Sequence, residues 1–282
     1  MEDLLMVRTF GIVGCMLIIS TITARLNKTY ETFTEKFITI LGAFASIIMV
    51  WVFGDITPHN IVACAFLSGF VGWSLGPTIG YIGQKFKWNK FLKDKGVKTK
   101  QISNKSGFWG TNNNTHFVYY FEGDEKNYFG PRSKKMRTLE DDFNKNVLSV
   151  DSDPYNQVWQ NVVFQAMLST CIAVFTTMLV VYISPYNFNF LGLILFISLI
   201  ALIIMRVLNA LIFKSAKQML YQSYFGIVIF TLYLVYDFDR LKQANAAGDN
   251  SWGTAVDIAV NIYLDIINLF IELLIAMGES SQ

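Results

Sequence analysis

The sequence contains seven runs of about 20 mostly apolar residues, and this feature restricts the fold more than any other. A run of that length crosses the roughly 30 Å hydrocarbon core of a bilayer as an α-helix. Charged residues make up only 16% of the chain, whereas a soluble domain contains about 25%. The sequence therefore predicts an integral, multi-pass membrane protein, an all-α bundle of seven transmembrane helices. The predicted helices cover residues 4–24, 37–54, 60–84, 158–183, 188–213, 218–243 and 252–277.

A long polar segment, residues 85–157, lies between the third and fourth predicted helices. It divides the chain into residues 1–84 with helices one to three, an extramembrane insertion at 85–157, and residues 158–282 with helices four to seven. Within the insertion, residues 115–129 contain two short aromatic runs separated by GlyAspGluLys, a pattern typical of a β-hairpin. An irregular loop is the alternative. The Lys-, Asn- and Ser-rich flanks are interpreted as solvated linkers.

The last predicted helix carries its polar residues on one face, because the spacings between them are 4, 4, 3 and 4 residues. A charged side chain at the centre of a bilayer costs at least about 2.5–3.5 kcal/mol. The acidic residues of this stripe must therefore face the bundle interior, a water-filled cavity or each other. A purely structural stripe is the alternative. The stripe consists of Asp257, Asn261, Asp265, Asn268 and Glu272.

The sixth predicted helix supplies an acidic partner for this stripe. Good helix formers continue beyond Asp237 to Gly248, which is expected to end the helix. If the chain turns near Asp249, Asp265 lies within about one 5.4 Å turn of the level of Asp237. Two carboxyl groups at that separation would share a proton and titrate as a pair. The spacing therefore predicts a proton switch between Asp237 and Asp265.

Nearby charges complete the predicted site. Asp239 is expected at the membrane interface, where it would pair with Arg240 or Lys242. Arg206 and Arg240 are the candidate counter-charges of the acidic stripe. For Arg206 the sequence leaves two alternatives, which are snorkelling to the interface and pairing with Glu272.

Composition excludes several other classes of function. The net charge is +2, and no basic patch alternates with aromatic residues, so no nucleic-acid partner is predicted. The three cysteines lie inside apolar runs and are interpreted as small core residues. The two histidines are isolated, so no cofactor and no resident metal are expected. The predicted partners are the lipid bilayer, protons, calcium ions and, through 85–157, another protein.

Two motifs of the last helices resemble the Bax inhibitor family, also called the transmembrane Bax inhibitor motif proteins. They are TyrLeuValTyrAspPheAspArgLeuLys (233–242) and IleTyrLeuAspIleIleAsnLeuPhe (262–270). AlaPheLeuSerGlyPhe (65–70) and SerLeuGlyPro (74–77) are similar to the family's third span. The resemblance implies a seven-helix bundle with a central helix and a proton-sensitive calcium leak. It also implies a paired-aspartate sensor at Asp237 and Asp265.

The chain departs from the family pattern in two places. Bacterial relatives carry a basic cluster at the end of the second span, where this chain reads ValTrpValPheGlyAspIleThrPro (50–58), without Lys or Arg. The insertion at 85–157 is also foreign to the compact family pattern. In addition, the distribution of Lys and Arg in the short loops predicts a cytoplasmic insertion and an external N-terminus, whereas the resemblance implies a cytoplasmic N-terminus. The membrane would be the plasma membrane in a bacterial source.

The leading functional hypothesis is a pH-sensitive, calcium-permeable leak channel in which Asp237 and Asp265 transiently bind calcium. Carboxylate and amide oxygens are suitable calcium ligands, and carboxylates in a pore favour cations. A non-conducting membrane regulator, which binds a protease or a cell-death protein, is the alternative.

An intramembrane aspartyl protease is the enzymatic alternative, because it also uses two carboxyl groups on adjacent spans. Tyr236-Asp237 fits one half of that pattern. The Gly-x-Gly-Asp half is missing, because Asp265 follows IleTyrLeu. The chain is therefore interpreted as non-enzymatic.

Overall fold

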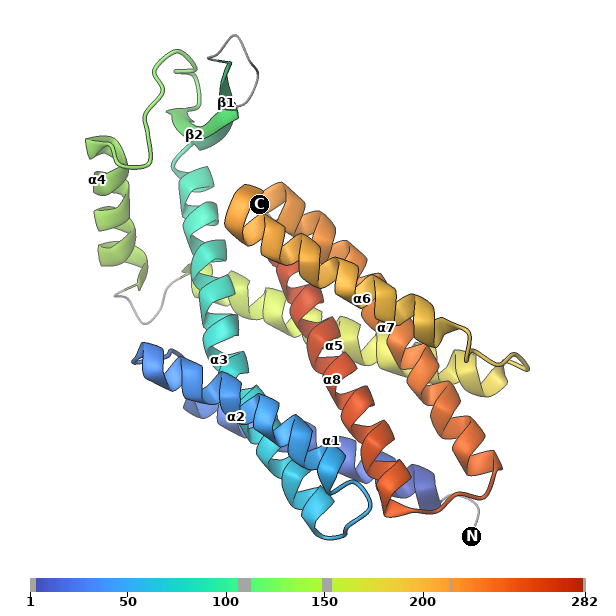
Figure 1. The fold of residues 1–282 in the computed structure, drawn as a ribbon. Helices are drawn as coiled ribbons and strands as arrows, with labels where there is room; N and C mark the ends of the chain where they lie inside the picture. Colours follow the sequence, from blue (N-terminus) through green and yellow to red (C-terminus); the bar gives the residue numbers. More distant parts are fainter. Residues whose placement is uncertain (1–3, 106–112, 149–153, 214, 281–282) are drawn as a thin grey trace. The chain divides into compact units, whose positions relative to one another are not determined.

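The computed structural model describes residues 4–105, 113–148, 154–213 and 215–280. Within these residues, seven helices are long and apolar enough to cross a membrane, which confirms the all-α, seven-span, multi-pass prediction (Figure 1). They are α1 (Leu4–Leu26), α2 (Phe33–Val52), α3 (His59–Asp94), α5 (Pro154–Ile183), α6 (Leu191–Leu208), α7 (Ala216–Ala246) and α8 (Trp252–Ser280). A π-helical turn, η2 (Asn209–Phe213), extends α6.

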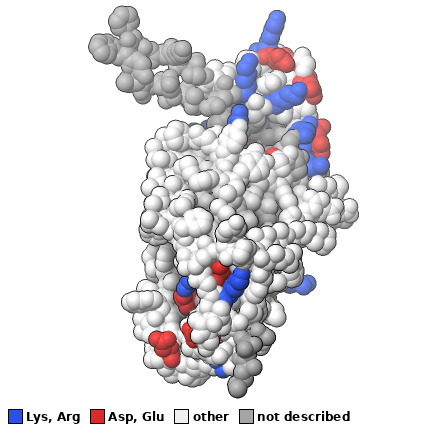
Figure 2. Space-filling view, turned by 90° about the vertical axis from the view of Figure 1, so that its right-hand side faces the viewer, with Lys and Arg blue, Asp and Glu red and all other residues white. Residues whose placement is uncertain are grey.

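The outer surfaces of these helices suit a lipid environment. Large apolar side chains are exposed on several of them, as at Trp51, Phe175 and Leu193, which are 84%, 67% and 70% exposed. Contiguous apolar surface of this kind is rare on soluble monomers and marks contact with a membrane or a partner. Figure 2 shows a face whose broad middle carries very few charged residues.

The central element of the bundle is α8. It packs against α7 and α1, and α6 packs against the outer side of α7 (Figure 1). More than half of the most apolar stretch of α8 is buried, compared with a third or less in the other six helices. The sequence pattern predicts one polar and one apolar face for α8. The structure shows that apolar side chains of this helix, such as Ile258 and Leu269, are also buried by neighbouring helices.

A polar contact joins α8 to the first and third helices. The Ser20 hydroxyl of α1 lies 2.5 Å from the Tyr263 hydroxyl of α8, and it lies 3.0 Å from the Ser68 carbonyl oxygen of α3. Farther along α3, a Cβ atom at Gly72 would lie 2.1 Å from the Thr23 hydroxyl. Only glycine therefore permits this approach, as is common where membrane helices pack closely. These contacts fix α8 and hence the residues next to Tyr263.

The described residues divide into two compact units, one within residues 4–82 and 163–280, the other within residues 83–162. The second unit contains β1 (Val97–Lys105), β2 (Asn113–Phe121), α4 (Lys134–Phe143) and a π-helical turn, η1 (Asn144–Leu148). It has its own apolar cluster, which includes Phe91, Phe129, Met136 and Phe143. Whether 85–157 is a separate functional domain stays a prediction.

The strand pairing differs from the sequence prediction. The principal partner of β2 is the upstream strand β1, which pairs antiparallel with it, and not the downstream run ending at Phe129. Phe129 forms only an isolated bridge with Tyr119. The partner was missed because β1 reads ValLysThrLysGlnIleSerAsnLys, which looks like a solvated linker. Pairing with an aromatic strand overrides the weak local strand preference.

The flanks of the hairpin were also interpreted wrongly as linkers. Downstream, α4 buries Met136 and Phe143, and the Ser133 hydroxyl caps its first turn by accepting a hydrogen bond from the Met136 amide. Upstream, α3 continues ten residues beyond the predicted end at Gln84, to Asp94. It continues because Phe91 and Leu92 lie in the apolar cluster of the second unit.

Candidate functional site

Two buried carboxyl groups meet between α7 and α8. Asp237 of α7 is 3% exposed and Asp265 of α8 is 8% exposed, and their carboxyl groups lie close enough to interact directly. A bond between two carboxyl groups requires a proton on one of them, because an ionised carboxylate only accepts. The Asp265 Oδ2 atom is buried without a partner among the described residues. The pair can therefore hold one proton between two helices.

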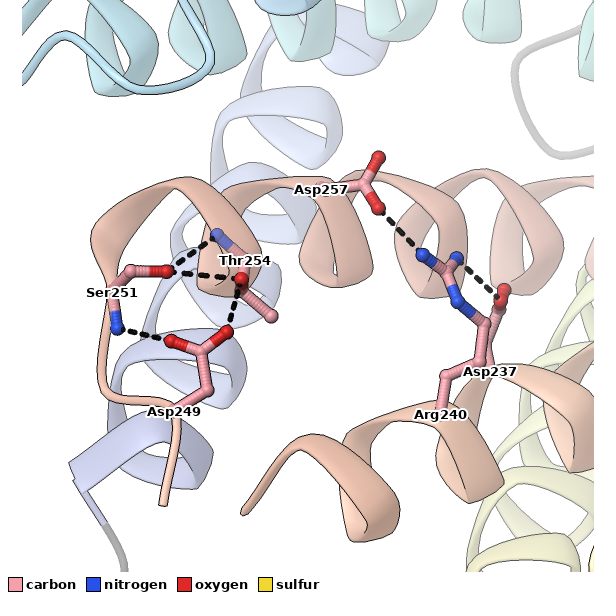
Figure 3. Close-up of polar contacts among 6 residues, drawn as sticks. All are labelled: Asp237, Arg240, Asp249, Ser251, Thr254 and Asp257. Carbon is pink, nitrogen blue, oxygen red and sulfur yellow. Dashed lines mark hydrogen bonds and ion pairs between the residues drawn. The ribbon is translucent and has the colours of Figure 1, made fainter. Parts of the chain in front are cut away.

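The turn between α7 and α8 sets this pairing. Gly248 follows the end of α7 and has a φ of +77°, a conformation that glycine adopts without strain. The Ser251 hydroxyl accepts a hydrogen bond from the Thr254 amide and so caps α8. The Asp249 carboxylate accepts bonds from the Thr254 hydroxyl at 2.6 Å and the Ser251 amide at 2.8 Å (Figure 3). These bonds hold the pKa of Asp249 below its usual value.

Arg240 connects the buried pair with the exposed end of the stripe. Its guanidinium lies 3.6 Å from Asp237 Oδ1 and donates a hydrogen bond of 2.7 Å to Asp257 Oδ2 (Figure 3). It also lies over the Tyr236 ring, 5.9 Å from the ring centre. Asp257 is 62% exposed, so Arg240 links a buried carboxyl group of α7 to an exposed one of α8.

Asp239 does not lie at the interface, as the sequence suggested. It is 2% exposed, and its Oδ2 accepts hydrogen bonds from the Phe188 amide and from the Gln243 side chain, both at 2.7 Å. Lys242 donates instead to the carbonyl oxygens of Val181 and Ser184. The expected pairing of Asp239 with Arg240 or Lys242 is therefore wrong among the described contacts. Unpaired backbone groups at the connection between α5 and α6 attract both side chains.

The far end of the stripe is buried and paired. Glu272 is 2% exposed, and both of its carboxylate oxygens accept hydrogen bonds from the Arg206 guanidinium. The sequence left snorkelling and pairing with Glu272 as alternatives for Arg206, and the structure shows the pairing with Glu272. Between Asp265 and the two ends, Asn261 and Asn268 are half-buried.

Sequence reasoning missed the small residues that make room for these charges. A Cβ atom at Gly226 would lie 2.7 Å from Glu272 Cδ, and the small side chain of Ser223 lies next to the same carboxylate. On α6, a Cβ atom at Gly192 would lie 3.1 Å from the Tyr236 hydroxyl. Their position could have been predicted from the three-residue spacing of Ser223 and Gly226, because small residues on one face of a membrane helix mark close packing.

The described residues contain no group of three or more His, Cys, Asp or Glu side chains that could hold a metal ion. A tightly bound calcium ion takes six to eight oxygen ligands. The pair of Asp237 and Asp265 offers fewer than that. The arrangement places two carboxyl groups side by side in a buried site between α7 and α8.

Comparison with known proteins identifies the C-terminal half of the chain. Residues 148–282 match the family described as "Inhibitor of apoptosis-promoting Bax1". This region contains α5, α6, α7 and α8, and therefore every residue of the candidate site.

Three similar curated proteins illustrate the extent of the match. Protein LIFEGUARD 4 of Arabidopsis thaliana is 32% identical over 39% of this chain and 43% of its own length. Protein LIFEGUARD 3 of the same plant is 32% identical over 40% of this chain and 45% of its own length. An uncharacterized membrane protein of Streptococcus pyogenes serotype M3 is 31% identical over 43% of this chain and 53% of its own length. The chain thus matches about half the length of these relatives.

Proposed function

We propose that this chain, which belongs to the Bax inhibitor family through residues 148–282, is a calcium-permeable leak channel with a proton switch at Asp237 and Asp265. The coarser conclusion, a multi-pass membrane protein of that family, rests on the seven helices and the family match. The observation that carries the finer proposal is the close approach of two buried carboxyl groups on the adjacent helices α7 and α8.

The switch follows from the chemistry of a shared proton. With one proton present, the two carboxyl groups attract each other and hold α7 against α8. Without it, two negative charges repel each other at close range in a poorly solvated site. The facing charged and titratable groups are Arg240, Asp257 and Tyr233. Because the contact joins the two helices, its loss would change the packing of α7 on α8 and so the path for ions.

Arg240 supports the same proposal. The end of the second span has no Lys or Arg at residues 50–58, so a latch from that place is absent from this sequence. In this chain the guanidinium next to Asp237 comes from α7 itself, three residues farther along the helix. We infer that Arg240 stabilises the resting arrangement by contacting Asp237 and Asp257 together.

Ion flux across liposomes containing the purified protein tests the proposal. We expect calcium flux in the wild type to change between about pH 5 and about pH 8, the range in which perturbed carboxyl pairs titrate. Asp237→Asn and Asp265→Asn each replace a titrating group with a neutral one of equal size. The ratio of flux at the two pH values should therefore approach that of a non-titrating pore in both variants.

Asp239→Asn is the matched control, because Asp239 is equally buried on the same helix but contacts a backbone amide and Gln243. An asparagine oxygen can still accept those bonds, so the control should keep the pH dependence of the wild type. Absent or pH-independent flux in the wild type would contradict the proposal.

A second candidate is a membrane regulator that binds another protein. The unit of residues 83–162 favours it, because this unit has its own apolar cluster and two-stranded sheet. The matched family is also described as an inhibitor of apoptosis-promoting Bax1. The channel and the regulator are not mutually exclusive, and removal of the insertion separates them.

A further inference from the structure

Glu272 is a second buried acid of α8 that the proton switch does not use. It lies seven residues beyond Asp265, which is about 10 Å farther along the helix axis at 1.5 Å per residue. Its side chain is 2% exposed. A carboxylate buried to this extent in a membrane-spanning helix is costly unless a cation or several hydrogen bonds compensate it.

Arg206 of α6 is that compensating cation. Its guanidinium donates to both carboxylate oxygens of Glu272. The Ser223 hydroxyl of α7 lies next to the same carboxylate and donates its hydrogen bond to the Met219 carbonyl oxygen. At Gly226 the carboxylate occupies the space that a side chain would fill, since a Cβ atom there would lie 2.7 Å from Glu272 Cδ. Three helices therefore form a fitted site for one carboxylate and one cation.

The two members of the pair differ in access to the surroundings. The Arg206 side chain is 39% exposed, whereas that of Glu272 is 2% exposed. The arginine can therefore swing outward on its flexible stem, as long basic side chains do at membrane interfaces. The glutamate stays fixed between α6, α7 and α8. Departure of Arg206 would leave a buried anionic site that attracts another cation.

We propose that Glu272, with the Ser223 hydroxyl, is a second cation-binding station, and that Arg206 occupies it as a tethered cation in the closed state. The proposal rests on the proposed channel function and extends the path from Asp265 toward the C-terminal end of α8. The ligand is a small inorganic cation, calcium included. One carboxylate and one hydroxyl provide fewer oxygens than calcium takes when tightly bound, and weak sites of this kind permit conduction.

The test measures calcium flux in liposomes for two single variants whose effects should have opposite signs. Arg206→Gln removes the tethered cation, so flux should rise by about tenfold, which corresponds to about 1.4 kcal/mol. Glu272→Gln removes the station itself, so flux should fall by a similar factor. A pair with only a structural role would change flux in the same direction in both variants, or in neither.

Three further variants keep the test decisive. Arg206→Lys retains a cation and should leave flux close to that of the wild type. Ser223→Ala removes one oxygen next to Glu272, and the hydrogen bond it loses goes to the Met219 carbonyl oxygen and not to Arg206, so it should lower flux even if Arg206→Gln does not fold. Lys217→Gln is the control for loss of a basic residue, because the Lys217 ammonium lies over the Tyr221 ring, whereas the ion-pair partner of Glu272 is Arg206.

The outcomes separate the two proposals. If the wild type conducts with a pH dependence that Asp265→Asn removes, but the Arg206 and Glu272 variants share one sign or have no effect, the station alone is overturned. If only Arg206→Gln conducts, the station is supported and the proton switch fails. If neither the wild type nor Arg206→Gln conducts at any pH, both proposals fail.

Discussion

At the scale of residues, Asp237 and Asp239 show how two acids separated by one residue of a helix acquire different surroundings. Both are buried. Asp237 contacts another carboxyl group and an arginine, whereas Asp239 accepts hydrogen bonds from a backbone amide and a glutamine. Their side chains point in different directions around α7. The proton response is therefore proposed for Asp237 alone, whereas Asp239 holds the loop at Phe188.

Asp249 gives a prediction for stability at low pH. The Thr254 hydroxyl and the Ser251 amide hold its pKa below the usual value, so the folded protein favours the ionised form. Its contribution to stability is therefore present above the unfolded-state pKa of about 4 and is lost as the pH falls through the lower folded-state pKa. Asp249→Ala should lower the melting temperature at neutral pH by about 1–3 °C.

The difference in melting temperature between Asp249→Ala and the wild type should become smaller toward about pH 3, where the wild-type carboxylate is also protonated. Thermal unfolding in detergent at the two pH values measures it. Asn250→Ala is the control, because it changes the neighbouring side chain without removing a titrating group. A deficit of equal size at both pH values would show that the charge of Asp249 has no part in the turn.

At the scale of elements, the end of α7 holds the connection between α5 and α6. Asp239 accepts from the Phe188 amide, and Lys242 donates to the carbonyl oxygens of Val181 and Ser184. Each side chain satisfies backbone groups that a helix end or a loop leaves unpaired. The acidic and basic residues that follow Asp237 in the sequence therefore fix a neighbouring pair of helices.

Removing the acceptor at Asp239 should loosen this connection. Asp239→Ala leaves the Phe188 amide without its partner, at an expected cost of about 1–3 kcal/mol. Hydrogen exchange of the segment 184–190 should become faster, and the melting temperature should fall. Asp239→Asn keeps an acceptor oxygen, so its melting temperature should fall much less. Equal losses in the two variants would mean that the Phe188 hydrogen bond does not hold the loop.

At the scale of the whole molecule, two units divide the chain. The candidate site and the proposed cation station lie entirely in the unit of residues 4–82 and 163–280, and the hairpin and α4 lie in the other. The proposed ion path uses only α6, α7 and α8. The second unit is therefore the part of the chain available for a separate role.

Replacing residues 87–153 with a flexible Gly/Ser linker should leave calcium flux and its pH dependence close to those of the wild type. Flux in liposomes measures the first property, and survival of cells under a death stimulus measures the regulator hypothesis. Retained flux with lost protection would assign regulation to the insertion. Lost flux in a variant that remains folded would contradict the division of roles proposed here.

Much of the site could be predicted because it depends on helical periodicity over a short distance. The four-residue spacing of Asp257, Asn261 and Asp265 places them on one face, and a turn near Asp249 brings Asp265 level with Asp237. Both inferences need only the geometry of a helical hairpin. The contact between the two carboxyl groups follows from that geometry, while its role as a sensor stays a prediction.

The sequence by itself determined the class of protein, its seven spans and the pairing of its last two helices, because hydrocarbon thickness and helical period act locally. Only the tertiary structure decided the surroundings of each charge. It placed α8 at the centre, paired Arg206 with Glu272, buried Asp239 and gave β2 an upstream partner. Those outcomes depend on which helix or strand lies next to which, and no local pattern encodes that choice.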